Sequence, residues 1–339
     1  MAEEKNIHEG IKSQFTEHFK CNVSLYEPLS SHGSDRLIIR LKADDGLSAI
    51  GIVHNNIAEN KAFILFSKQF RKSGLRVPHI YRVSDDLKYY LMEDLGDITF
   101  AKLLTHRKSA DLETELTDLY KKSIDELLKF QIEAGGSVDY SLCYQFNEFG
   151  DKNIDFDLNY FKERFLKNFY TVFDEKKLNV DLNCLKEKIL KVPAEYFLYR
   201  DFQSRNIMLK DKELYFIDYQ SGRRGALQYD IASLLYDAKA DIPQSEREEL
   251  LDYYIEKAAE YVKIKRTEFI NVFWYFALVR ILQAMGAYGF LGVVKGKERF
   301  LESIPYAVKN VNLLLSEKIN NDELGYLRNI FEELKYDKV

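Results

Sequence analysis

The feature that most restricts the fold of this chain is the segment 197–232, where polar residues follow two short apolar runs. A loop after the first run holds Asp201 and Asn206, and an apolar hairpin over residues 207–217 then ends directly before Asp218. This pattern predicts a strand, loop and hairpin unit that brings two carboxylates and one amide to the same end.

These three side chains are the types that phosphoryl transfer with Mg²⁺ requires. Magnesium takes oxygen ligands and keeps several waters, so one carboxylate and one amide suffice when nucleotide phosphates complete the shell. Asp218 and Asn206 match that role, and Asp201 is one loop away, where a base can receive the proton of an attacking hydroxyl. The alternative explanation is that these residues only form turns and caps, a common use of Asp and Asn.

The first 95 residues are typical of a small antiparallel sheet with one helix. Residues 60–72 have helical spacing that ends at Ser73 and Gly74. Runs of β-branched and aliphatic residues, separated by polar turns, predict strands at Val23–Leu29, Arg36–Lys42, Leu47–Val53 and Tyr89–Met92.

Helices dominate the pattern after residue 97. They are predicted at Glu113–Ala134, Tyr229–Lys239, Ser245–Val262 and Thr267–Gly289. The last lies in an apolar stretch whose middle holds Arg280 and Gln283, and a central Arg costs about 2.5 to 3.5 kcal/mol in a membrane, so we expect a buried core helix. The expected fold class is α+β with two lobes, a small antiparallel-sheet N-lobe (1–95) and a larger, mostly helical C-lobe (96–339) that carries the catalytic and acceptor-binding residues.

Composition removes several classes of function. The chain has 339 residues with 49 Lys plus Arg against 54 Asp plus Glu, a net charge of -5, so we expect neither nucleic acid nor a membrane as partner. The three cysteines form no CxxC pair, and we do not expect the charged amino terminus to act as a signal peptide. We expect a cytoplasmic protein acting on a small molecule, and the sequence leaves its oligomeric state open.

The spacing D-x-x-x-x-N, an apolar strand ending in Ile-Asp, and the later Tyr-Asp-Ile-Ala resemble the aminoglycoside/choline phosphotransferase families, relatives of protein kinases. The resemblance implies a bilobal protein-kinase-like fold with ATP and Mg²⁺. It also implies that Asp201 is the catalytic aspartate, that Asn206 and Asp218 hold the metal, and that Asp230 braces the catalytic loop.

The strings RDFQSRN, YLMEDLGD and PHI are similar to the sugar kinases of peptidoglycan recycling, which phosphorylate N-acetylmuramate and N-acetylglucosamine at the anomeric hydroxyl. The resemblance therefore implies an amino-sugar acceptor. Two alternatives stay open: a kinase for another hydroxyl compound such as choline, an aminoglycoside or another sugar, and a nucleotide-binding pseudokinase without transfer.

The sequence departs from the kinase pattern in three places. Tyr199 stands where protein kinases have His, and Tyr219 and Gln220 follow the metal aspartate in place of Phe and Gly. The third strand, 47–53, contains no lysine to hold the nucleotide phosphates. The first two departures and the missing lysine favour the pseudokinase, whereas the intact set of one base and two metal ligands argues against it.

Candidates for the missing cation are Arg36, just after a polar turn that includes Ser34, and Arg40 on the following strand. We expect Ser34 and Arg36 to contact the nucleotide, although an ion pair between Arg36 and a surface carboxylate explains it equally well. Glu59, at the front of the helix 60–72, corresponds to the kinase helix glutamate or is simply a helix-start acid.

The hinge between the two lobes is expected near residues 93–96. By the same resemblance the adenine is expected to form hydrogen bonds with the hinge backbone at Glu93 and Leu95. Four polar residues are expected to bind the acceptor: Arg223, Arg224, Arg280 and Gln283. Arginines suit a neutral or anionic acceptor such as N-acetylmuramate better than a cation. Surface salt bridges for the first two, and an internal ion pair of Arg280 to Asp230 or another carboxylate, are the alternatives.

Overall fold

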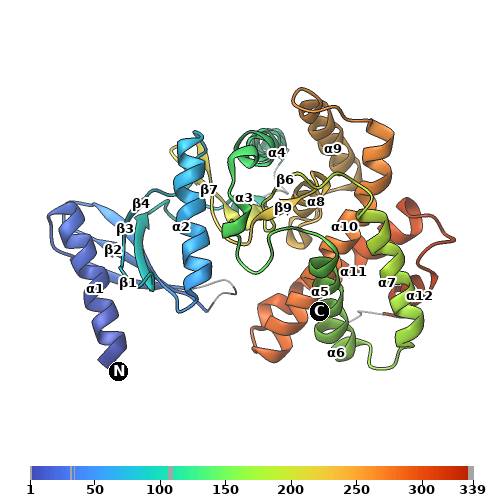
Figure 1. Ribbon diagram of the computed structural model, residues 1–339, viewed down its shortest axis with the longest axis horizontal. Helices are drawn as coiled ribbons and strands as arrows, with labels where there is room; N and C mark the ends of the chain where they lie inside the picture. The colour runs from blue at the N-terminus through green and yellow to red at the C-terminus, as the bar shows by residue number, and fades with distance from the viewer. Residues whose placement is uncertain (1, 31–32, 34, 106–109, 335–339) are drawn as a thin grey trace.

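The computed structural model describes residues 2–30, 33, 35–105 and 110–334. Figure 1 shows two lobes, a sheet with flanking helices at the N-terminal end and a mostly helical body that makes up the rest. The expected α+β class, with a small antiparallel sheet followed by a larger helical part, is confirmed. The division of the chain at residues 95 and 96 stays a prediction.

The N-lobe sheet is antiparallel, with strand order β1-β2-β3-β5-β4. Its strands are β1 (Leu25–Leu29), β2 (Leu37–Lys42), β3 (Ser48–Val53), β4 (Ile80–Val83) and β5 (Tyr89–Glu93). Because side chains alternate along a strand, one face of this sheet packs against α1 (Ala2–Phe19) and the other against α2 (Ile57–Lys72). Four strands were expected from the sequence, and β4 was missed.

Helix α1 is the second element of the N-lobe that the sequence pattern did not predict. Ile11 and Phe15, four residues apart and therefore on one helix face, are fully buried against Ile39 and Leu41 of β2. Gly51 of β3 makes this close packing possible, because a Cβ there would lie 2.7 Å from a methyl carbon of Ile11. This helix was not predicted because most of its residues are charged or polar and its apolar stripe is narrow.

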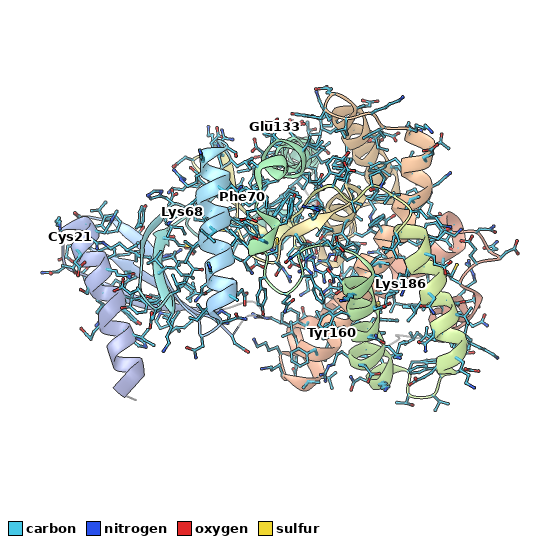
Figure 2. All side chains as sticks on the ribbon, in the orientation of Figure 1. Cys21, Lys68, Phe70, Glu133, Tyr160 and Lys186 are labelled. Carbon is cyan, nitrogen blue, oxygen red and sulfur yellow. The ribbon has the colours of Figure 1, made fainter. Side chains whose placement is uncertain are left out.

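Helix α2 lies between the sheet and the C-lobe and contacts both. It begins after Asn56, whose side chain accepts a hydrogen bond from the Glu59 N–H (3.2 Å), and its predicted end at residue 72 is confirmed. Phe70 makes edge contacts with Phe130 (4.9 Å between ring centroids) and Phe197 (5.1 Å), and Figure 2 shows Phe70 on the side of α2 that faces the C-lobe. One hydrophobic core therefore runs from the sheet through α2 into the C-lobe.

The C-lobe combines helices with two small two-stranded sheets. The helices are α3 (Phe100–Leu104), α4 (Ala110–Leu128), α5 (Asp151–Phe161), α6 (Lys167–Phe169), α7 (Glu175–Ile189), α8 (Gln228–Leu235), α9 (Gln244–Ala259), α10 (Arg266–Tyr288), α11 (Ile304–Leu313) and α12 (Gly325–Glu333). The sheets pair β6 (Tyr196–Leu198) with β9 (Arg223–Gly225), and β7 (Ile207–Lys210) with β8 (Glu213–Phe216). The four C-lobe helices expected from the sequence are present as α4, α8, α9 and α10.

Helix α10 resembles a membrane span in its length and apolar character. Together with the turn after it, Arg266–Val294 is long and apolar enough to cross a membrane, but 61% of its most apolar window is buried inside the protein. The helix packs against α5 and α8. Its C-terminal end fits closely because a Cβ at Gly289 would overlap the carbonyl oxygen of Arg164. The segment is a core helix of the C-lobe, as its central polar residues predicted.

Candidate active site

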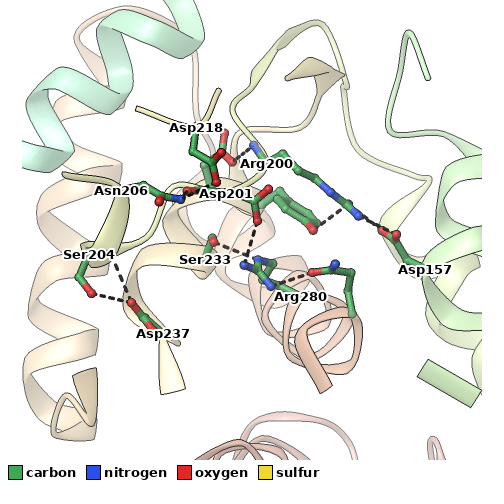
Figure 3. A network of polar contacts seen from close by, with 12 residues as sticks. Asp157, Arg200, Asp201, Ser204, Asn206, Asp218, Ser233, Asp237 and Arg280 are labelled. Atoms are coloured by element: carbon green, nitrogen blue, oxygen red, sulfur yellow. Dashed lines mark hydrogen bonds and ion pairs between the residues drawn. The ribbon is translucent and has the colours of Figure 1, made fainter. Parts of the chain in front are cut away.

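The segment 197–218, which holds the candidate catalytic residues, folds as its sequence pattern predicted. The short strand β6 leads into a loop, a single helical turn ends at Asn206, and the β7-β8 hairpin returns the chain to Asp218. The Asn206 amide nitrogen donates to the backbone carbonyl of Asp201 (2.8 Å) and lies 3.4 Å from the Asp218 carboxylate. Figure 3 shows the side chains of all three residues gathered at one place. The hairpin thus brings together the residues that the motif singled out.

Four residues of this segment have a positive φ, which L-residues rarely use; two form the hairpin turn at 211–212, and the other two lie at the candidate carboxylates. Arg200, directly before Asp201, has φ of 84°, and Asp218 has φ of 71°. Such strain costs about 1 to 3 kcal/mol per residue and persists only where the surroundings enforce it. Arg200 turns the chain directly before Asp201, and Asp218 turns it at its own position. Backbone strain of this kind is concentrated at functional sites.

Arg200 is anchored beneath the catalytic loop by a buried ion pair. Its guanidinium makes two hydrogen bonds to the Asp157 carboxylate of α5 (2.7 and 2.6 Å) and one to the Tyr229 hydroxyl (2.8 Å). Burial acts to lower the pKa of Arg200, but the adjacent Asp157 charge outweighs it and the net shift is upward. The loop is therefore fixed from the α5 side.

Asp230 fixes the same loop from α8. Its carboxylate accepts hydrogen bonds from the backbone N–H groups of Tyr199 (2.7 Å) and Arg200 (2.9 Å) and from the side-chain amide of Gln131 (3.3 Å). Burial raises the pKa of Asp230 to about 7, and these donors act in the opposite direction. The structure thus places Asp230 where the resemblance implied a loop-bracing aspartate.

The residues after Asp218, the candidate metal ligand, are held firmly although they differ from the kinase pattern. Tyr219 is fully buried; its ring stacks on Phe63 of α2 (4.9 Å between centroids, 4° between planes), and its hydroxyl meets that of Ser67. The Gln220 side-chain amide donates to the Asp218 carboxylate (2.9 Å). Tyr219 therefore connects this turn to helix α2, and Gln220 connects it to the Asp218 side chain.

Arg36 and Glu59 meet beside Asp218. Arg36 forms an ion pair with Glu59, in the first turn of α2, and its guanidinium also lies 3.5 Å from the Asp218 carboxylate. His54 lies 3.6 Å from the other Glu59 oxygen, and burial lowers its pKa. The structure therefore places a cation and its carboxylate partner next to the candidate metal ligand, although the third strand lacks a lysine.

The second candidate cation, Arg40, lies at the hinge instead. It makes two hydrogen bonds to Asp94 (2.8 and 3.0 Å), one to the Gly96 carbonyl (3.2 Å) and an ion pair with Asp97 (2.8 Å). The guanidinium therefore contacts Asp94, the Gly96 carbonyl and Asp97, all within residues 94–97. Arg40 thus stabilises the connection between the lobes.

The hinge backbone is partly occupied by contacts within the protein. The Glu93 N–H donates to the His79 carbonyl (2.8 Å), and the Asp94 carbonyl accepts from Lys210 (3.1 Å), which also pairs with the Glu93 carboxylate (2.8 Å). The Leu95 N–H, by contrast, donates no hydrogen bond within the described part of the chain. Of the two expected adenine contacts, Leu95 is thus the one with an available N–H.

The four expected acceptor residues fall into two groups. Arg280 (3.6 Å from the Asp201 carboxylate) and Gln283 lie beside the catalytic loop. Arg223 is buried, and its guanidinium donates hydrogen bonds to the Ser221 carbonyl and to the Asn153 side chain. Burial, together with the nearby charge of Arg200, lowers the pKa of Arg223 to about 10. Arg224 is exposed and lies over the Tyr140 ring at 4.7 Å. The structure thus does not bring all four to one place, and Ser34, the remaining nucleotide candidate, lies outside the described residues.

The APH family of phosphotransferase enzymes matches this chain over residues 55–265, which include the hinge and the whole catalytic segment. The chain belongs to this phosphotransferase family. Its membership makes the protein a phosphotransferase that acts on a hydroxyl group, and the match extends from α2 to the end of α9.

Individual relatives agree with the family match. The chain is 22% identical over 307 residues to the N-acetylmuramate/N-acetylglucosamine kinase of Pseudomonas aeruginosa, covering 88% of this chain and 86% of that protein. It is 26% identical over 237 residues to the protein of the same name from Neisseria meningitidis serogroup B, covering 68% of each. The crystal structure of choline kinase LicA from Streptococcus pneumoniae superposes with a TM-score of 0.60 at 12% identity, covering 90% of this chain and 99% of that one. The expected kinase-like fold is thereby confirmed.

Several residues that support the phosphotransferase site were missed by sequence reasoning. Asp157, Gln131 and Ser233 each contact the catalytic loop or a residue beside it, from helices that are distant from it in the chain. No local motif marks Asp157 or Gln131. Ser233 carried a weak signal, because it lies three residues after Asp230 and so shares its helix face.

Proposed function

We propose that this phosphotransferase is an ATP- and Mg²⁺-dependent kinase for an amino sugar, and that it phosphorylates the anomeric hydroxyl of N-acetylmuramate or N-acetylglucosamine. The observation that carries the proposal is the convergence of Asp201, Asn206 and Asp218, joined by the Asn206 amide (2.8 and 3.4 Å). These are the base and the two oxygen ligands that phosphoryl transfer needs.

The donor set around Asp218 fits Mg²⁺. It offers a carboxylate and an amide, both hard oxygen ligands, and the Asp218 side chain is 36% exposed and so accessible from outside. Within the described residues there is no cluster of three or more His, Cys, Asp or Glu side chains that would form a complete protein cage. This agrees with an ion that takes one or two protein ligands and completes its shell with nucleotide phosphates and water. Bound Mg²⁺ would neutralise charge on those phosphates.

Arg36 is the residue that we assign to the phosphates in place of the missing lysine. Glu59 fixes its guanidinium from the first turn of α2, and Asp218 lies 3.5 Å away, so the cation is held at the end of the site where the metal ligands are. An arginine can bind phosphate oxygens through two parallel hydrogen bonds, which a lysine cannot do.

The transfer step follows from the position of Asp201. Its carboxylate accepts the proton of the acceptor hydroxyl while that oxygen forms a bond to the γ-phosphorus. The bond between the γ-phosphorus and the bridging oxygen breaks, and ADP leaves with the electron pair. The Arg200–Asp157 pair and the Asp230 hydrogen bonds hold the loop in place during this step.

The acceptor is proposed from the two curated relatives, whose shared name specifies both amino sugars. The test is phosphorylation of a panel with Mg-ATP: N-acetylmuramate, N-acetylglucosamine, choline and kanamycin. We expect turnover of the two sugars only.

The methyl glycoside of N-acetylglucosamine is the matched control compound, because it keeps every other hydroxyl but lacks the anomeric one. It should not react, and the sugar phosphate formed should be labile in mild acid, as a glycosyl phosphate is. Turnover of only choline or kanamycin, or phosphorylation of the methyl glycoside, would contradict the proposal. Asp201→Asn, which keeps the shape of the side chain, should lower kcat by about 10² or more.

A further inference from the structure

Arg280 is a buried charge in the apolar middle of helix α10. It is 4% exposed, its Nε donates to the Ser233 hydroxyl of α8 (2.9 Å), and one terminal nitrogen donates to the Gln283 side-chain carbonyl (2.8 Å). Both partners are neutral, so they satisfy hydrogen bonds without balancing the charge. A buried guanidinium needs a carboxylate nearby, because an unpaired buried charge is strongly unfavourable.

The carboxylate that balances Arg280 is that of Asp201. The second terminal nitrogen lies 3.6 Å from Asp201 Oδ1, and this is the ion pair found for Arg280 among the described residues (Figure 3). The Asp201 side chain is 27% exposed and that of Arg280 only 5%. Arg280 therefore lies beneath Asp201, and a molecule that approaches from outside meets the carboxylate first.

One helix controls both the backbone and the side chain of the candidate base. Asp230 and Ser233 are three residues apart on α8 and therefore share a face. Asp230 accepts from the two N–H groups that precede Asp201, whereas Ser233 holds the guanidinium that faces its carboxylate. Gln283 holds the same guanidinium from α10, so its orientation is set from two directions.

We propose that Arg280 is a positioning residue for Asp201: it holds one carboxylate oxygen so that the other stays available to the acceptor hydroxyl. The inference rests on the proposed function and refines the sequence-based expectation for Arg280, since the guanidinium acts on the acceptor only through Asp201. The separation of 3.6 Å is an ion-pair distance and exceeds that of a good hydrogen bond. Removal of Arg280 should therefore impair the chemical step more than acceptor binding.

The first test is the split between kcat and KM. Arg280→Met should lower kcat by at least about tenfold, since a small misplacement of a catalytic group can cost up to about 10²-fold, with the acceptor KM changed less than about threefold. Arg280→Lys should recover part of kcat, because an ammonium still faces Asp201 but cannot also hold Ser233 and Gln283. Ser233→Ala, which keeps the charge, should lower kcat by a few-fold at unchanged KM.

Arg247→Met is the matched control. Arg247, on α9, is also a buried arginine of the C-lobe, but its guanidinium lies over the Tyr236 ring at 4.4 Å. The Arg247→Met variant should keep kcat and the acceptor KM within about twofold of the natural values. A rise of the acceptor KM above about tenfold in Arg280→Met, or an unchanged kcat, would overturn the proposal.

The second test does not depend on turnover. The unfolding free energies of Arg280→Met, Asp201→Asn and the double variant form a cycle that measures their coupling. We expect the double variant to be less destabilised than the sum of the single changes, and additive effects would overturn the pairing. Failure of the proposed function is a separate result, because it would show as no transfer to any sugar by the unmodified protein.

Discussion

The hydroxyl groups of Ser67 and Tyr219 lie 2.5 Å apart and join helix α2 of the N-lobe to the residue that follows Asp218. The Ser67 hydroxyl also donates to the Phe63 carbonyl (2.7 Å), so it keeps a hydrogen-bond partner when the Tyr219 hydroxyl is removed. Tyr219→Phe should therefore lower the unfolding free energy by only about 1 kcal/mol. Tyr219→Ala should cost about 3 to 5 kcal/mol, because it removes a buried ring. Chemical denaturation measures both values. Tyr215→Phe, on the half-buried part of β8, is the control; equal effects of Tyr219→Ala and Tyr215→Phe would contradict the assigned role.

The buried pair of Arg200 and Asp157 predicts strong coupling in stability. Arg200→Met should lower the unfolding free energy by about 3 to 5 kcal/mol, because it leaves the Asp157 charge buried without a partner. The double variant with Asp157→Leu should lose less than the two single changes together. Lys239→Met serves as control, since its pair with Glu302 is exposed and should contribute about 1 kcal/mol or less. Additive losses measured by denaturation would show that the pair contributes no coupling.

Asp230 predicts a specific dependence of stability on pH. Burial raises its folded-state pKa to about 7 from an ordinary value of 3.8, so the folded protein binds this proton more tightly than the unfolded chain. Stability from this residue is therefore fully present below about pH 4 and is lost as the pH rises to about 7. Asp230→Asn removes the titration, so the stability of the natural protein relative to this variant should fall between pH 4 and 7. A difference that stays constant across this range, measured by denaturant titration, would refute the shift.

Arg36 predicts a defect in nucleotide binding. Arg36→Met should weaken the binding of Mg-ADP by about tenfold or more, which corresponds to about 1.4 kcal/mol, because the cation assigned to the phosphates is lost. Calorimetry measures this affinity, and the thermal shift given by saturating Mg-ADP should decrease with it. Glu59→Gln should have a smaller effect in the same direction. Arg82→Met on β4, which breaks an exposed ion pair with Glu17 of α1, should leave the affinity unchanged. Equal defects in both arginine variants would argue against the assignment.

The local arrangement of the site was predictable because its parts are close in sequence. Asp201 and Asn206 share one loop, and a short hairpin leads to Asp218, so the spacing alone determines that they meet. The anchors of that loop were not predictable in the same way. Asp157 reaches the loop from helix α5, and Ser233 of α8 contacts Arg280 beside it. Such contacts depend on how the helices pack rather than on any local pattern.

The two candidate cations show a different limit. Arg36 and Arg40 are separated by an even number of residues, so the strand alternation places them on the same side and cannot separate their roles. Four residues of extended chain span about 13 Å, however, which is enough to put one beside Asp218 and the other at the hinge. Only the position of each residue along the strand, relative to the C-lobe, distinguishes them.

Helix α2 limits how far the two lobes can move apart. Its Phe63 stacks on Tyr219 (4.9 Å between ring centroids), and its Phe70 packs on Phe130 and Phe197, so aromatic contacts join α2 to the C-lobe at both places. A wide swing about residues 93–96 would expose these aromatic rings to water.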